Sequence, residues 1–275
     1  MVTEIILDTE STNISNVCVS KLITSPPQSI AFIKYNKKQL LTVKTEPIRI
    51  TSYGIPQLDK NGAHFYPMDK QRHFIKIPLD PDQNSCIKLK KLLQKMDEYF
   101  GSKQFRKILF GTKYFDKYQY QLSVRTKQAY PDSDDYDSDD DDSPPSKNKK
   151  IYPDYCKVVF MGDRNQMNIS TILTRYNKNI PVRTVTDMEQ YVKWGSTYTF
   201  CIHIYKIWAN TSPVHGATKK LYGLGLKMKE IIISQPYIHF SHYIPECDLV
   251  GIKRVYKTYM DEKKNSIQKY LEIEI

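Results

Sequence analysis

Two long runs of β-forming residues constrain this chain more than any other feature. They are STYTFCIHIYKIWA at 196–209 and LYGLGLKMKEIII at 221–233. The first is rich in Ile, Tyr, Phe and Thr and the second in Leu and Ile, and both exceed the usual strand length of about five to six residues. Because only a loop of residues 210–220 separates them, we expect one long antiparallel pair. Such a pair needs further strands beside it to bury an apolar face, so a β-rich domain is predicted.

Shorter runs in the first 80 residues supply candidates for those neighbouring strands. Pro, Gly and Asn residues separate them, as in the turns of β-sheet proteins. The runs are SIAFIKY (29–35), LLTVKT (40–45), IRITSYG (48–54) and HFIKIPL (73–79). Short strands with turns between them are typical of a sandwich or a barrel.

Two segments have the pattern of helices. In KLKKLLQKMDEYF (88–100) the apolar residues recur at helical spacing with lysines on the other face, which predicts an amphipathic helix. Asn84 or Ser85 is the expected N-cap, and Gly101 is expected to end the helix. A shorter helix is predicted at 186–194.

An acidic run divides two further strand-like segments. YQYQLSVRT (118–126) and YCKVVFMG (155–162) both read as strands, and residues 130–143 between them contain eight aspartates and no Lys or Arg. A run this polar repels itself and buries nothing. We therefore expect a hairpin with a long disordered acidic loop at 130–150. The predicted domain spans 1–235, and 236–275 forms a C-terminal extension for which the pattern favours neither helix nor strand.

The charge balance points to a polyanionic ligand. The net charge is +11, and without the eight clustered aspartates the remaining 41 basic and 22 acidic residues give +19. A surface this basic attracts the phosphate backbone of nucleic acids. The 21 tyrosines add aromatic rings on which unpaired bases can stack. A lysine-rich solvated surface without a ligand is the alternative interpretation of the charge.

Secretion, membrane insertion and catalysis are disfavoured by the sequence. The five cysteines are scattered and never form C-x-x-C, as expected of reduced thiols inside a cell. Residues 1–11 carry acids where a signal peptide needs positive charge, and no apolar run approaches the length of a membrane span. There is no phosphate loop and no hydrolase or metalloprotease motif. We expect neither an enzyme nor a bound cofactor.

Two weak motifs do not change that expectation. YGLGLK (222–227) has two glycines but lacks the third that a dinucleotide-binding loop requires, so a bulge or a close backbone approach is the better interpretation. His239, His242 and Cys247 have spacing suited to zinc, but no fourth ligand accompanies them. We therefore predict no metal site.

Basic and aromatic residues alternate in two places, which together form the predicted nucleic-acid-binding set. The first comprises Lys113, Tyr114, Lys117, Tyr118, Tyr120 and Arg125. On a strand Tyr118 and Tyr120 share one face, so they form either part of the core or an exposed stacking platform.

The second constellation lies on the long strand pair. It comprises Tyr205, Lys206, Trp208, Lys219, Lys220, Tyr222, Lys227 and Lys229. Alternation places Lys227 and Lys229 on one face of the strand, opposite Leu226 and Met228. Lysines on one face and apolar residues on the other suit an electrostatic groove, although an ordinary amphipathic surface strand has the same pattern.

The order of these elements resembles a known family. TEPIRITSYGI (45–55), the helix at 88–100, YVKWGSTYTFCIHIYKIWA and KKLYGLGLKMKEIII are similar to segments of the OB-fold single-stranded DNA-binding proteins of nucleocytoplasmic large DNA viruses. Those proteins in turn resemble phage replication proteins. The resemblance spans about residues 30–235, and its most specific part is Tyr-Gly-x-Gly-x-Lys at 222–227.

The resemblance implies a mainly β (α+β) fold, namely an OB-fold-like β-barrel with an embedded helix. It also implies sequence-independent binding of single-stranded DNA in viral DNA replication, recombination or repair, in the cytoplasm of the infected host cell or in the virion. RNA is an alternative ligand, and a basic structural or virion protein that packs nucleic acid is an alternative function. The phage proteins carry their acidic tract at the C-terminus, whereas here it is internal, so recruitment of replication proteins would have to use the acidic loop.

Overall fold

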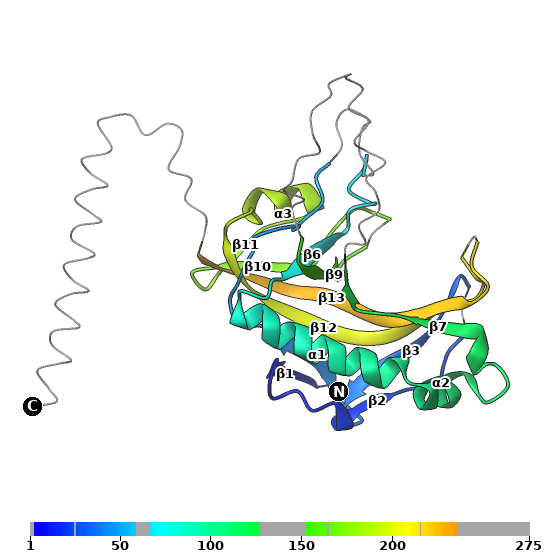
Figure 1. The fold of residues 1–275 in the computed structure, drawn as a ribbon. Helices are drawn as coiled ribbons and strands as arrows, with labels where there is room; N and C mark the ends of the chain where they lie inside the picture. The colour runs from blue at the N-terminus through cyan, green and yellow to red at the C-terminus, as the bar shows by residue number, and fades with distance from the viewer. Residues whose placement is uncertain are drawn as a thin grey trace, which may run out of the picture. The chain divides into compact units, whose positions relative to one another are not determined.

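The long strand pair predicted from the sequence forms the centre of the fold. A computed structural model describes residues 3–24, 26–58, 66–126, 152–163, 165–214 and 216–235. In it, β12 (Thr197–Asn210) pairs antiparallel with β13 (Lys220–Gln235) over most of their length. Figure 1 shows these two strands running through the sheet, with other strands on both sides. The predicted antiparallel pair is confirmed.

Each long strand has its own set of neighbours. The other edge of β12 pairs antiparallel with β3 (Gln28–Tyr35), β4 (Leu40–Lys44) and β5 (Ile48–Arg49). The other edge of β13 pairs parallel with β7 (Tyr118–Gln121), β9 (Asp154–Phe160) and β10 (Ile172–Arg175). The sheet is therefore mixed, and the two long strands join its antiparallel and parallel parts.

The remaining strands extend this arrangement. β9 also pairs with β6 (Phe74–Leu79) and with β8 (Val124–Arg125). Three strands lie at the edges of the arrangement: β1 (Glu4–Asp8) pairs with β4, β2 (Val17–Val19) pairs with β3, and β11 (Lys178–Ile180) pairs with β10. Thirteen strands and three α-helices lie in the described part of the chain, so the fold is mainly β as predicted.

The helices largely follow the predicted pattern. They are α1 (Asn84–Gly101), α2 (Lys103–Phe110) and α3 (Val185–Tyr191), with two 3₁₀ turns, η1 (Ile14–Asn16) and η2 (Phe115–Lys117). The N-cap of α1 is Gln83, so the prediction of Asn84 or Ser85 is wrong by one or two positions, and the helix includes Gly101. Ser102 then caps α2 by accepting a hydrogen bond from the backbone N–H of Phe105.

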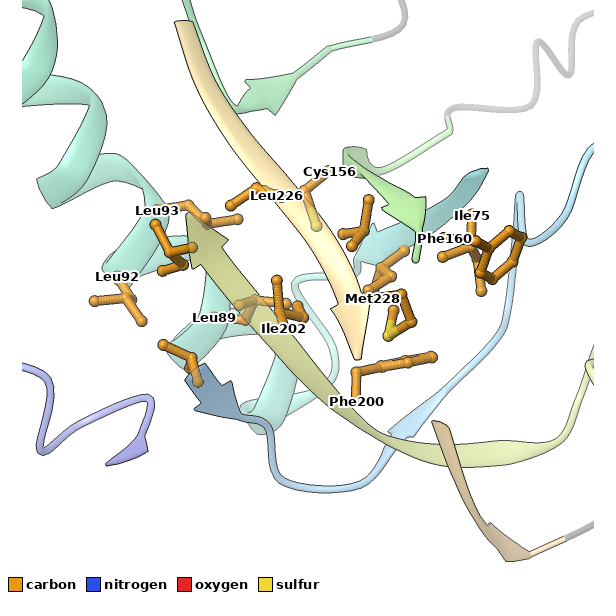
Figure 2. Close-up of a cluster of buried hydrophobic side chains, with 14 of the residues drawn as sticks. Ile75, Leu89, Leu92, Leu93, Cys156, Phe160, Phe200, Ile202, Leu226 and Met228 are labelled. Atoms are coloured by element: carbon orange, nitrogen blue, oxygen red, sulfur yellow. The ribbon is translucent and has the colours of Figure 1, made fainter. Parts of the chain in front are cut away.

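The core lies between α1 and one face of the sheet. Figure 2 shows Leu89, Leu92 and Leu93 of α1 near Ile202 and Leu226 of the long strands. All five side chains are buried, and the cluster continues through the residues of β6 and β9. Burying a side chain of this size contributes about 1.5–3 kcal/mol, so this packing determines which face of β12 and β13 turns inward.

The strands on either side of the acidic run form the predicted hairpin. Residues 118–126 divide into β7 and β8, and β8 pairs antiparallel with β9. The acidic residues 130–143 lie outside the described residues, as does the extension 236–275. No helix in the part of the chain that the structure describes is long and apolar enough to cross a membrane.

Candidate nucleic-acid interface

The two faces of the β12–β13 pair have different chemistry. The inward face carries apolar residues against α1, while the register places His203 opposite Lys227, Lys206 opposite Gly225 and Trp208 opposite Gly223 on the other face. We call the surface formed by these six residues and their neighbour Tyr205 the lysine face. It brings together four members of the second predicted constellation, Tyr205, Lys206, Trp208 and Lys227, above the two glycines of β13.

A β-bulge shapes the centre of the lysine face. The register shifts between Ile204 and Lys206, so Tyr205 and Lys206 both lie over Gly225. A Cβ atom at Gly225 would stand 2.7 Å from Cγ of Lys206, and one at Gly223 would stand 3.0 Å from the Trp208 ring. The glycines of YGLGLK therefore allow β12 side chains to lie flat on β13, which agrees with a bulge and not with a cofactor loop.

Two lysine ammonium groups converge on one tyrosine ring. Nζ of Lys227 lies 4.7 Å and Nζ of Lys206 lies 5.2 Å from the centre of the Tyr205 ring. Burial, and then the charge of Lys227, lowers the pKa of Lys206, and burial raises the pKa of Tyr205 to about 12. No carboxylate within the described ranges forms an ion pair with either lysine. An anion bound here would relieve the repulsion between the two cations.

Lys229 differs from its neighbour Lys227. Its ammonium group forms an ion pair with Glu4 of β1, and Glu4 also accepts a hydrogen bond of 2.6 Å from Thr42. Its charge is therefore already matched by a carboxylate. The prediction that Lys227 and Lys229 together line one electrostatic groove needs correction, because of these two lysines only Lys227 has no ion-pair partner among the described residues.

Phe32 extends the lysine face and was not predicted as a site residue. It lies on β3 opposite Lys206, diagonal to Trp208, with 42% of its side chain exposed. Trp208 is half-buried, and its indole N–H donates to the carbonyl of Leu224 at 3.3 Å. Phe32 on β3 and Trp208, whose ring lies over Gly223 of β13, therefore present two aromatic rings on the same face as the lysines.

Three tyrosines of the two constellations pack within or against the core. The Tyr120 hydroxyl donates to Asp97 at 2.8 Å, and the fully buried Tyr222 donates to the carbonyl of Phe100 at 2.7 Å. Tyr118 stacks in parallel on Phe110, with ring centres 3.7 Å apart. Of the two roles left open for Tyr118 and Tyr120, the structure places them in packing roles. Tyr222 has no exposed surface for a base, so its assignment to the binding set needs correction.

The other predicted residues, apart from Arg125, gather at the corner formed by α2, η2 and the start of β13. Tyr114 is 46% exposed, and Nζ of Lys113 and of Lys117 lie 5.5 and 5.3 Å from its ring centre. Lys220 lies over Tyr118 at 5.7 Å, and Lys219 precedes it as an exposed residue. This corner is strongly cationic, but it lies on a different part of the molecule from Tyr205 and Lys206.

A second aromatic group lies on the β6–β9 side of the sheet. The ring centre of Tyr53 is 4.8 Å from that of Tyr155 and 5.9 Å from that of Tyr152, and Nζ of Lys76 lies 5.2 Å from the Tyr155 centre. Arg125 pairs with Tyr155 across β8 and β9. Alternation along β9 places Tyr155 on the same face as Val159, which is opposite Lys227.

This second group was missed because its members are far apart in the sequence. The Tyr53 segment and the Tyr152–Tyr155 segment are separated by about a hundred positions. The one available signal was the alternation of Tyr and Lys within each strand-like run, which does not say which runs become neighbours. Arg125 alone was predicted.

Metal binding finds no support in the described part of the chain. No group of three or more His, Cys, Asp or Glu residues there is arranged to hold an ion. His239, His242 and Cys247, the weak zinc motif of the sequence, lie outside the described residues.

Comparison with known proteins adds a viral relative. The chain matches no protein-family model. It is similar to the uncharacterized protein R505 of Acanthamoeba polyphaga mimivirus, with 34% identity over 216 residues. The match covers 71% of this chain and 51% of the mimivirus protein, so the chain spans about half the length of that relative.

Proposed function

We propose that this chain binds single-stranded nucleic acid, in particular DNA, without sequence preference, and that the lysine face is its main contact. The observation that carries the proposal is the convergence of Lys206 and Lys227 on Tyr205, next to the rings of Phe32 and Trp208. Cations for phosphates and aromatic rings for bases are the two components that single-strand binding requires.

In this proposal each group has a distinct role. Lys206 and Lys227 contact phosphates, and Tyr205 holds their ammonium groups in place through cation–π attraction. Phe32 and Trp208 stack on unpaired bases. Every base has an aromatic face, so stacking of this kind accepts any sequence. Duplex DNA hides those faces within its own stack, which gives the preference for single strands.

We further propose an OB-fold type of barrel and a role in viral DNA replication, recombination or repair. The proposal rests on the resemblance of the sequence to single-stranded DNA-binding proteins of large DNA viruses. It is supported by a mainly β sheet with α1 packed into its core and by the similarity to a mimivirus protein. The proposed location is the cytoplasm of the infected cell.

Tryptophan fluorescence can test the proposed contact directly, because the chain has only two tryptophans. In a Trp194→Phe variant, Trp208 is the one remaining indole. We expect single-stranded DNA to quench its emission in a saturable way, since a base stacked on the indole ring quenches the excited state by direct contact. The apparent affinity should also fall as salt rises, with a slope of about 0.7 per phosphate contact on a logarithmic plot.

A matched variant and a second ligand make this test decisive. Trp208→Phe leaves Trp194, which is 61% exposed near α3, and its emission should change little on addition of DNA. Duplex DNA of equal length should bind more weakly. Equal affinity for duplex and single strands, with no quenching of Trp208, would contradict the proposal and favour a protein that packs nucleic acid through charge alone.

The acidic run gives a separate prediction from its charge. Its eight aspartates are tethered to the hairpin of β8 and β9, which bears Arg125 and Tyr155. Tethering gives such a segment an effective concentration of about millimolar, so it competes with DNA for the lysines even if its own affinity is weak. Deleting residues 132–143 should tighten single-strand binding severalfold at low salt and less at high salt.

The control for this deletion keeps the length of the segment. Replacing the eight aspartates by asparagines removes the charge alone and should have the same effect as the deletion. If both variants bind DNA like the unaltered chain at every salt concentration, the acidic run does not compete with DNA, and recruitment of replication proteins becomes the better account of it.

A further inference from the structure

Tyr176 occupies an unusual backbone conformation at the tip of the β10–β11 hairpin. Tyr176 and Asn177 form the turn, with φ of 51° and 57°, both in the left-handed region. Two-residue turns of this kind favour Asn or Gly, which adopt positive φ at little cost. A bulky side chain is uncommon there. The chain thus keeps an aromatic residue at a position where Asn or Gly would stabilise the turn, and strain of this kind is often kept for function.

The Tyr176 ring is presented to solvent beside unmatched positive charge. Its side chain is 75% exposed, the largest value among the exposed large hydrophobic residues of the described chain. The Arg175 guanidinium lies over the ring, 5.0 Å from its centre. Nε of Arg175 is buried with no hydrogen-bond partner, and Lys178 stands opposite Arg175 across the hairpin. Neither cation has an ion-pair partner among the residues described.

The hairpin lies far from the lysine face along the same strand. Arg175 pairs with Ile233 of β13, whereas Trp208 pairs with Gly223, ten positions earlier. At about 3.3 Å per residue the hairpin is about 30 Å from Trp208 and, because Lys227 is six positions before Ile233, about 20 Å from Lys227. Figure 1 shows β10 and β11 at one end of β13 and β7 toward the other end.

We propose that Tyr176 is a second base-stacking site, which captures a distant part of the same single strand that the lysine face binds. This inference rests on the proposed function and adds to it. An unpaired base stacks on the exposed Tyr176 ring, and Arg175 and Lys178 contact the adjoining phosphates. Arg175 lies opposite Ile233, on the face of β13 that carries Ile231, so a strand leaving the lysine face reaches the ring by passing around the end of the sheet. The site gives length-dependent affinity, because the second contact forms only with a strand long enough to span both.

The test uses the variant Tyr176→Asn, which should weaken binding of single-stranded DNA without lowering the stability of the fold. Asn is favoured in this turn, so the unfolding midpoint should stay the same or rise. Affinity for a thymidine oligomer of about 20 nucleotides should fall about fivefold or more, the loss expected for one stacked base. Affinity for an oligomer of about 2 nucleotides, too short to span the roughly 20 Å from Lys227 to the hairpin, should not change. Tyr176→Phe keeps the ring and should bind both oligomers like the unaltered chain.

Fluorescence anisotropy with labelled oligomers separates the possible outcomes. Equal affinity of Tyr176→Asn and the unaltered chain for the longer oligomer overturns the second site while leaving the lysine face intact. An equal loss with both oligomers also overturns it, because a remote contact cannot affect a strand that does not reach it. If the unaltered chain binds neither oligomer, the proposed function itself fails.

Discussion

Replacing Phe32 and Trp208 together by leucine should weaken binding of single-stranded DNA by at least about thirtyfold. Each ring is expected to stack on one base, and removal of a stacked aromatic residue costs about 1–3 kcal/mol per base. The two losses should nearly add if the rings hold different bases. Leucine keeps an apolar side chain at both positions, so the inward packing of β3 and β12 is retained. Anisotropy titration of a labelled oligomer measures the change.

Two controls distinguish the loss of base stacking from an effect on folding and from an effect on charge. Tyr191→Leu removes another partly exposed ring, on α3, and should leave the affinity unchanged. The salt dependence of binding should persist in the Phe32 and Trp208 variant, because Lys206 and Lys227 remain. Binding of the double variant within about threefold of the unaltered chain would show that the rings do not stack on bases.

The long strand pair could be predicted because its signal is local and strong. Residues 196–209 and 221–233 alternate over more than ten positions each, and the turn residues between them are plain in the sequence. The amphipathic pattern of α1 was equally clear, with Leu89, Leu92 and Leu93 facing the core. The shorter elements α2, β1, β2, β10 and β11 were not predicted, since three to eight residues give too few periods to identify a pattern.

Which face of a strand turns inward was harder to predict than the strand itself. Tyr118 and Tyr120 share one face of the strand whether that face is buried or exposed. Because α1 packs against that face, the Tyr120 hydroxyl donates a hydrogen bond to Asp97. Tyr222 is opposite Ala209 in the register, and both are buried. Tyrosine suits both a core and a stacking platform, so residue type alone could not separate these tyrosines from Tyr205.

Contacts between distant segments account for the site residues that were missed. Phe32 meets Lys206 and Tyr53 meets Tyr155 only because strands far apart in the chain become neighbours. A single sequence shows each residue beside its chain neighbours and does not give the order of strands. The site could therefore be predicted where it lies within β12 and β13, and not where it extends to β3, β6 and β9.

Replacing Asp97 by alanine should lower the free energy of unfolding by about 3–5 kcal/mol, the largest effect on stability expected for this chain. The buried Asp97 carboxylate accepts the Tyr120 hydroxyl at 2.8 Å and the backbone N–H groups of Ser123 at 2.9 Å and Val124 at 3.2 Å. Hydrogen bonds to charged groups contribute about 1.5–3 kcal/mol each, and unsatisfied buried donors are costly. Against a typical total of about 5–15 kcal/mol, the loss is severe. Urea unfolding with linear extrapolation measures it.

The Asp97 carboxylate also fixes the position of Arg125, a residue of the predicted nucleic-acid-binding set. By holding the turn between β7 and β8, Asp97 positions Arg125 opposite Tyr155. Asp116→Ala, at an exposed carboxylate in η2, is the matched control and should change stability by less than about 0.5 kcal/mol. Tyr120→Phe removes a single donor and should fall between the two variants. If Asp97→Ala is no less stable than Asp116→Ala, the carboxylate does not fasten this turn, and the placement of Arg125 must depend on the β8–β9 pairing alone.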